Sequence, residues 1–126
     1  MVWTITADRP VYVQLVEQLE QAIVAGEARA GSKLPSVREL AAQAGVNPNT
    51  MQRAMQELET KGLILTQRTA GRTVTEDEMV IQAARKQLAQ DELLRFLEKM
   101  HSIGFSTQEI MALLQTEEEH HDDTTM

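Results

Sequence analysis

Within a stretch of fewer than thirty residues, the chain alternates residues that start helices with residues that end them, and this alternation constrains the fold most. Ser36 stands three residues before Glu39, which is the spacing of a capping box at a helix start. Gly45 interrupts that helix, and Asn47-Pro48 supplies the cap and first-turn proline of another, which Gly62 ends. The pattern therefore predicts two short helices joined by a tight turn at a glycine.

Apolar residues recur at three- and four-residue steps in both helices and in a segment before them, which places them on one face of each helix. The earlier segment starts at Asp8-Arg9-Pro10, where Asp8 or a neighbour can cap a helix, and Gly26 can end it in a left-handed conformation. The residues expected to face the core are Tyr12, Leu15, Val16, Leu19, Ala22, Ile23, Val37, Leu40, Ala41, Ala44, Met51, Ala54, Met55 and Leu58.

Two short β-prone runs follow the helices, at residues 63–66 and 73–75. The segment between them is polar and contains Gly71, which predicts a hairpin whose tip carries Arg68 and Arg72. Three helices followed by a hairpin are the order of a winged helix-turn-helix. In that fold a steep crossing of two helices lets the second one protrude far enough to enter a DNA major groove.

The remainder of the chain is predicted to be helical and then disordered. A helical pattern runs from about Asp77 to about His101, and Ser106-Thr107-Gln108-Glu109 forms a second capping box after a glycine break. The residues from Glu117 onward are acidic, and we expect them to be a disordered tail. The expected fold is mainly α with a small β-hairpin wing. It comprises a DNA-binding domain at 1–76, a two-helix dimerisation segment at 77–116 and a tail at 117–126.

The net charge of −7 is unevenly distributed, which matters because DNA responds to the local field of one face. Residues 1–75 carry eight basic and seven acidic side chains, whereas residues 76–126 carry four and twelve. The chain has no cysteine, so it has no disulfide framework and no thiolate metal site, which fits a cytoplasmic location. No apolar run approaches the roughly 18 residues of a membrane span, and no signal-peptide pattern opens the sequence.

The outward face of the helix at 48–61 carries amides, a hydroxyl and an arginine, and the segment 48–56 contains no acidic residue. Amide and guanidinium groups suit hydrogen bonding to purine edges in the major groove. The free N–H groups at the start of that helix favour a phosphate. The composition therefore predicts a recognition helix rather than an ordinary solvated face.

Residues 9–75 contain several spaced motifs: the strings 10–12 and 26–27, then Leu34-Pro35-Ser36-Val37-Arg38-Glu39-Leu40-Ala41, then Gly45-Val46-Asn47-Pro48-Asn49-Thr50-Met51-Gln52-Arg53-Ala54, then Leu58 and Gly62-Leu63-Ile64. In this order and spacing they resemble the GntR family of bacterial regulators. The short two-helix appendage and the Asn-Pro-Asn-Thr opening resemble the YtrA subfamily. That resemblance implies a homodimer built through the C-terminal helices, often with repression of neighbouring transporter operons.

The resemblance implies contacts with double-stranded operator DNA from the start of the first short helix, from the recognition helix and from the wing. The residues assigned to this role are Ser36, Arg38, Asn47, Asn49, Thr50, Gln52, Arg53, Gln56, Arg68, Gly71 and Arg72. The chain departs from the family at Pro48, which cannot donate a side-chain hydrogen bond, and at Thr69-Ala70-Gly71, which lacks the lysine common at the wing tip.

The appendage has more apolar surface than two helices can bury alone, which favours dimerisation. The assigned residues are Val80, Ile81, Ala84, Leu88, Leu94, Leu97, Ile110, Leu113 and Leu114. A competing interpretation is that the stripe at 80–100 packs back on its own domain. A small-molecule effector would have to bind at the dimer interface or between the helix at 77–101 and the winged domain.

The alternative function is that of a winged-helix module for protein–protein association, in which the acidic C-terminal part makes the contact. An enzyme is disfavoured, because the chain lacks a phosphate loop and a plausible nucleophile set. We expect no cofactor and no metal. His120-His121 beside five acidic residues could bind a divalent ion weakly, but a solvated tail is the favoured interpretation.

Overall fold

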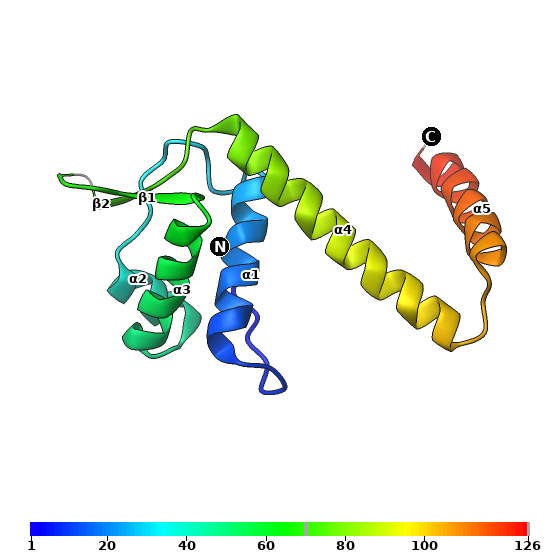
Figure 1. Ribbon diagram of the computed structural model, residues 1–126, viewed down its shortest axis with the longest axis horizontal. Coiled ribbons are helices and arrows are strands. Elements are labelled where there is room, and N and C mark those ends of the chain that lie inside the picture. Colours follow the sequence, from blue (N-terminus) through cyan, green and yellow to red (C-terminus); the bar gives the residue numbers. More distant parts are fainter. Residues whose placement is uncertain (70, 126) are drawn as a thin grey trace. The chain divides into compact units, whose positions relative to one another are not determined.

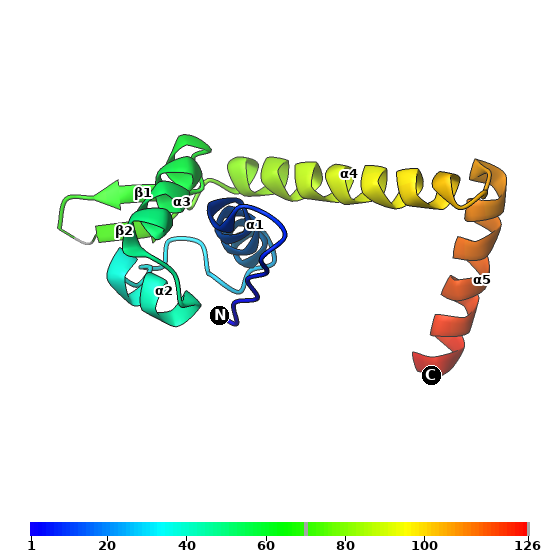
Figure 2. The same ribbon diagram turned by 90° about the horizontal axis from the view of Figure 1, so that it is seen from below.

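The computed structural model describes the backbone of residues 1–69 and 71–125 and the side chains of that range up to residue 119. Its elements are shown in Figures 1 and 2. In chain order they are α1 (Val11–Val24), α2 (Val37–Ala44), α3 (Pro48–Thr60), β1 (Ile64–Gln67), β2 (Gly71–Val74), α4 (Glu78–Ser102) and α5 (Thr107–Thr125). The chain divides into two compact units, Met1–Leu88 and Ala89–Met126. We call them the winged unit and the C-terminal unit.

The core of the winged unit lies where α3 packs against α1 and α2 (Figure 1). Met51, Ala54, Met55 and Leu58 are fully buried, so the predicted inward face of the recognition helix is confirmed. Leu15, Leu19 and Leu40 oppose them and are equally buried. Each of these Leu and Met side chains contributes about 1.5–3 kcal/mol relative to exposure, so this apolar face holds the three helices together.

The predicted helix starts at α2 and α3 are confirmed in atomic detail. Ser36 Oγ accepts from the Glu39 N–H at 3.1 Å, and Glu39 Oε1 accepts from the Ser36 N–H at 3.3 Å. Asn47 Oδ1 accepts from the Asn49 N–H at 2.7 Å. Gly45, at φ +70°, adopts the left-handed conformation that lets α2 stop and the chain turn into α3. Local capping therefore sets the helix-turn-helix.

The hairpin is antiparallel, and Ile64 faces Val74 while Thr66 faces Arg72. The preceding loop extends this small sheet, because the Gly31 N–H donates to Val74 O and the Leu34 N–H donates to Arg72 O. Gly31 has φ +78°, and a Cβ there would lie 2.6 Å from the Glu76 carboxylate. The loop before α2 is thus hydrogen-bonded to the wing, which fixes the start of α2 relative to β2.

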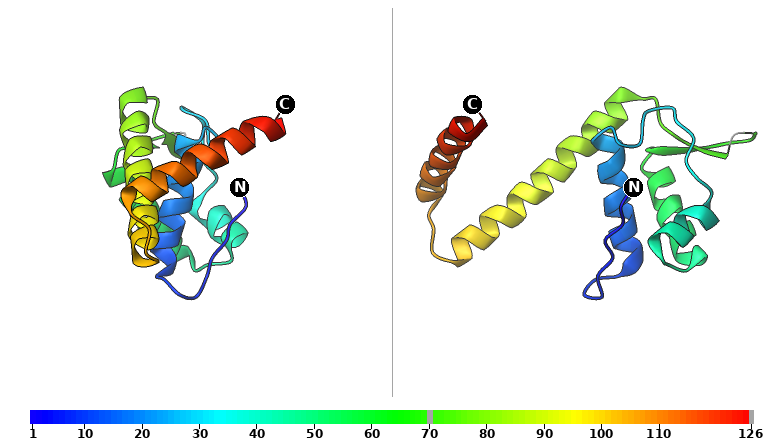
Figure 3. Two further views of the ribbon diagram at one scale, coloured as in Figure 1. Left: turned by 90° about the vertical axis from the view of Figure 1, so that its right-hand side faces the viewer. Right: turned by 180° about the vertical axis from the view of Figure 1, so that it is seen from behind.

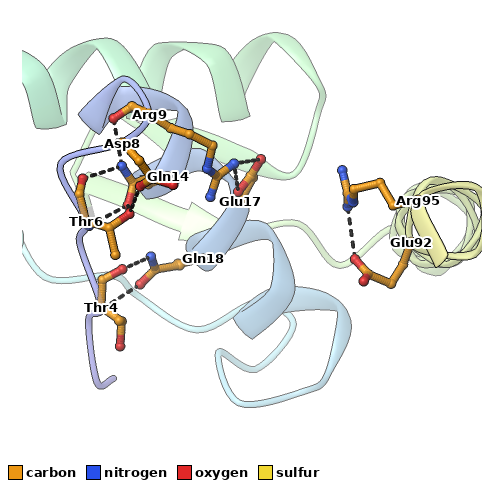
Figure 4. Close-up of polar contacts among 9 residues, drawn as sticks. All are labelled: Thr4, Thr6, Asp8, Arg9, Gln14, Glu17, Gln18, Glu92 and Arg95. Carbon is orange, nitrogen blue, oxygen red and sulfur yellow. Dashed lines mark hydrogen bonds and ion pairs between the residues drawn. The ribbon is translucent and has the colours of Figure 1, made fainter. Parts of the chain in front are cut away.

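The entry to α1 differs from the prediction. Pro10 is the N-cap residue and no side chain caps the helix, while Asp8 instead accepts a hydrogen bond from the Thr6 hydroxyl. The N-terminal segment runs alongside α1 (Figure 3). Gln14 and Gln18 of α1 form hydrogen bonds with the backbone of Thr6 and Thr4 in that segment (Figure 4). Each side-chain amide donates a hydrogen bond to the backbone of the N-terminal segment and accepts one from it, much as a paired β-strand does. These hydrogen bonds hold the segment along α1.

The winged unit extends into α4, later than the boundary predicted at residue 76. Ile81 is 6% exposed in the core, and Val80 and Ala84 pack against it. These three residues, assigned to dimerisation from the sequence, pack against the core of the winged unit, whereas Leu94 of the same stripe is exposed. The first turns of α4 therefore belong to the winged unit.

In the C-terminal unit, the second capping box is confirmed. Ser106 Oγ accepts from the Glu109 N–H at 3.2 Å, and Glu109 Oε1 accepts from the Ser106 N–H at 3.0 Å. The prediction of a disordered tail from Glu117 is corrected, because α5 continues to Thr125. Capping at Ser106 starts a helix that continues well beyond Leu114, the last apolar residue of α5, and composition alone does not reveal this.

Candidate nucleic-acid interface

The exposed face of α3 carries most of the side chains predicted to read bases. Asn49, Arg53 and Gln56 are exposed, and Thr50 and Gln52 are half-buried. The buried face lies on the opposite side, so α3 presents an acid-free polar surface over its first two and a half turns. This surface offers donors and acceptors of the kind that hydrogen-bond to base edges.

A groove of about 750 Å³ joins this surface to α2 and the wing. It brings together five residues predicted from the sequence, and it adds a lysine that the sequence analysis missed. The predicted residues are Ser36, Arg38, Gln52, Gly71 and Arg72.

Lys33 is the residue that sequence reasoning did not find. It forms an isolated β-bridge with Thr73, which places it beside Gly71 and Arg72 at the wing. The only available signal was a basic residue just before Leu34-Pro35, since the pairing with β2 is long-range. Lys33 and Arg38 both line the groove, and their cationic side chains suit phosphate oxygens.

Arg53 is held in place by an aromatic ring. Its guanidinium carbon lies 3.6 Å from the ring centroid of Tyr12, which α1 contributes. A cation over a ring face gains about 0.5–1 kcal/mol at an exposed site. Arg53 is therefore partly ordered before any ligand binds, and Tyr12 is a supporting residue that the sequence analysis placed only in the core.

The wing holds its two arginines in different surroundings. Arg68 lies in the turn after β1 and is exposed. Arg72 lies in β2 and not at the tip, and its Nε donates to Glu59 Oε1 at 2.6 Å. The expectation of two arginines at the tip is thus corrected for Arg72, because β2 begins at Gly71, earlier than predicted.

Asn47 also has a structural role, since its side-chain oxygen caps α3. Ser36 likewise accepts a capping hydrogen bond, although a hydroxyl that accepts can still donate. These two predicted contact residues are therefore positioned by the caps that they form. They lie at the two helix starts whose free N–H groups favour a phosphate.

Among the residues that the structure describes, no group of three or more histidine, cysteine or acidic side chains could hold a metal ion. The side chains of His120 and His121 lie outside the described residues. No helix in the described ranges combines the length and apolarity needed to cross a bilayer.

Comparison with known proteins agrees with this geometry. Residues 11–74 match the gntR family of bacterial regulatory proteins. The chain is 34% identical over 110 residues to the HTH-type transcriptional regulator YhcF of Bacillus subtilis, covering 87% of this chain and 91% of YhcF. It is 31% identical over 102 residues to the HTH-type transcriptional repressor YtrA of the same organism, covering 80% and 78%.

A solved structure of a GntR family transcriptional regulator from Listeria monocytogenes is also similar. Its TM-score is 0.81 at 37% identity, covering 88% of this chain and 97% of that one. The family resemblance and the winged-helix fold predicted from the sequence are both confirmed. The chain belongs to the GntR family of bacterial transcriptional regulators and is similar to its YtrA-type members.

Proposed function

We propose that this chain is a sequence-specific repressor that binds operator DNA as a homodimer, with a neighbouring operon, such as one for a transporter, as its target. The observation that carries the proposal is the groove in which the start of α2, the acid-free face of α3 and the start of β2 meet. Lys33 and Arg38 supply phosphate contacts there, and Gln52 lies at the same groove. The name of YtrA, a repressor, supports the direction of regulation.

The proposal of a homodimer rests on the C-terminal unit. This unit leaves Leu93, Leu94, Ile103, Met111 and Leu114 more than half exposed. A unit of under about 40 residues rarely has its own stable core without a disulfide, a metal or a partner. The chain has no cysteine, so a second copy is the occupant that we propose for this apolar surface. Two copies of α3 would then read half-sites about one helical turn (~34 Å) apart, or further.

The function can be tested by fluorescence anisotropy, with DNA from upstream of the chain's own gene and a scrambled duplex, over a salt series. We expect preferential binding to the upstream DNA, and we expect that binding to weaken steeply as salt rises. Each phosphate contact releases a counterion from the DNA, and this release is less favourable at high salt. Equal and feeble binding to both duplexes at low salt would contradict sequence-specific recognition there. It would favour the protein-binding alternative.

Two variants separate the roles of the groove residues. Arg38→Ala should weaken binding to both duplexes and reduce the salt slope by about one, as expected for one lost phosphate contact. Gln52→Ala should mainly reduce the preference for upstream DNA, by about 1–3 kcal/mol if the amide pairs with one base. Equal losses on both duplexes for both variants would refute this division of roles.

A further inference from the structure

One carboxylate of the recognition helix is bonded to both strands of the wing. Glu59, near the C-terminal end of α3, accepts through Oε1 from Arg72 Nε at 2.6 Å and from Thr66 Oγ1 at 2.8 Å. Thr66 and Arg72 face each other across the hairpin, one on each strand. The three side chains therefore form a single junction between α3, β1 and β2, which we call the wing junction.

The strand register shows where this junction acts. Side chains alternate between the two faces of a strand, so the Thr66–Arg72 pair shares a face with the Ile64–Val74 pair. Ile64 and Val74 are buried in the core against α3, at 1% exposure each. The wing junction continues that contact by one cross-strand pair toward the turn, with polar groups in place of apolar ones.

The charge of Glu59 at the wing junction is unfavourable for DNA binding. A glutamate is ionised at neutral pH, and the hydrogen bond from Arg72 lowers the pKa of the Glu59 carboxyl further. An ionised carboxylate on the recognition helix repels phosphate, and it offsets the charge of Arg72. If Glu59 had no structural role, its carboxylate would only lower the affinity for DNA.

We propose that Glu59 is a positioning residue that fixes the wing relative to the recognition helix. Arg72 then acts through Glu59, and Arg68 is the arginine of the wing that is available to the DNA backbone. With the junction intact, α3 and the wing approach DNA as one rigid surface, and without it the wing samples other orientations. This inference rests on the proposed DNA-binding function for its consequence but not for the junction itself.

The first test uses Glu59→Gln, with Glu57→Gln as a matched control on the same helix. Both variants remove one negative charge, but Glu57 is exposed and only Glu59 bonds the wing. Charge removal alone should tighten DNA binding, and we expect this for Glu57→Gln. We expect Glu59→Gln to bind about three- to tenfold more weakly, because the affinity falls with the fraction of molecules whose wing is correctly placed. Tighter binding by both variants would overturn the proposal.

A double-mutant cycle then separates positioning from direct contact. If Arg72 acts through Glu59, Arg72→Gln should weaken DNA binding alone and have little further effect in the Glu59→Gln background. If Arg72 binds a phosphate itself, it should weaken binding equally in both backgrounds and lower the salt slope by about one each time. The second result would overturn the assignment of Arg72.

Amide hydrogen exchange of the free protein tests the junction without DNA. We expect faster exchange in β1 and β2 of Glu59→Gln than of Glu57→Gln, with α1 and α3 core amides unchanged, since local opening governs exchange. Equal wing exchange in the two variants would refute the junction. Faster wing exchange in a protein that binds no DNA would refute the proposed function and leave the junction standing.

Discussion

The winged unit and the C-terminal unit are built with the same local devices, but their apolar side chains end in opposite surroundings. Each contains a Ser–Glu capping box, at Ser36 and at Ser106. In the winged unit the apolar stripes of three helices are buried. In the described part of the C-terminal unit, Ile110 is the one fully buried hydrophobic side chain. An amphipathic stripe thus predicts that a face will be buried without saying what covers it.

The contrast is sharpest for substitutions in the core of the winged unit. Leu58 is fully buried on α3, so Leu58→Ala should lower the free energy of unfolding by about 2–5 kcal/mol. Urea unfolding followed by circular dichroism measures this. The control is Leu65→Ala, because Leu65 is 43% exposed in the adjacent strand and should cost far less. Equal losses for the two variants would mean that the winged unit lacks the core described here.

In the C-terminal unit the same kind of change should act on assembly. Leu94→Glu with Leu114→Glu should raise the dissociation constant of the proposed dimer by about a hundredfold or more, because burying unpaired carboxylates costs several kcal/mol. Sedimentation velocity over a concentration series measures it. The far-ultraviolet circular dichroism spectrum of the chain should still show the folded helices of the winged unit.

The matched control for assembly is Gln90→Glu with Gln115→Glu, which adds the same charge at exposed polar positions of α4 and α5. That variant should sediment as the parent chain does. A parent chain that is monomeric at high concentration would refute the proposed dimer, as would identical behaviour of the two double variants.

The two capping boxes give a smaller effect that still separates the units. Ser36→Ala should lower the unfolding free energy of the winged unit by about 1 kcal/mol, because an N–H at the start of α2 loses its acceptor. Ser106→Ala should leave that transition unchanged and reduce helix content and self-association instead. Thermal unfolding and sedimentation distinguish the two. An equal loss of winged-unit stability in both variants would show that the units unfold together.

The sequence predicted best what neighbouring residues determine. The caps at Ser36 and Asn47 and the inward face of α3 follow from spacings of two to seven residues, and all were correct. The hairpin was found, but β2 begins earlier than its β-prone run, because Gly71 at φ +73° opens the strand directly after the turn.

What the sequence did not show depends on pairs distant in the chain. Glu20 is 8% exposed at its side chain and bonds Lys61 at 3.0 Å, 41 residues away, and nothing local indicates this partner. Lys33 reaches the groove only because its loop pairs with β2. Arg72 was expected to face DNA, and its bond to Glu59 depends on a strand register that composition does not reveal.

The smallest expected effect is a pH dependence that the wing junction adds to the winged unit. The Glu59 pKa is depressed in the folded state, chiefly by the hydrogen bond from Arg72, below its ordinary value of 4.5. A depressed carboxyl pKa stabilises the fold above the ordinary value, and this stabilisation is lost as pH falls through the folded-state pKa. The stability advantage of the parent chain over Glu59→Gln should therefore shrink as pH drops below about 4.5.

Urea midpoints from pH 7 to pH 3 measure this difference, with Glu57→Gln as the control that should show no such change. The effect should be smaller than that of the Ser36 cap, because partly exposed ion pairs contribute only about 0.2–1 kcal/mol and salt screens them. A constant difference between the parent and Glu59→Gln across this range would mean that the carboxylate is not bonded to Arg72 in solution. Glu109 extends the comparison to the C-terminal unit. The hydrogen bond from the Ser106 backbone N–H lowers its pKa, so acid should weaken the start of α5 with the same sign but without loosening the wing.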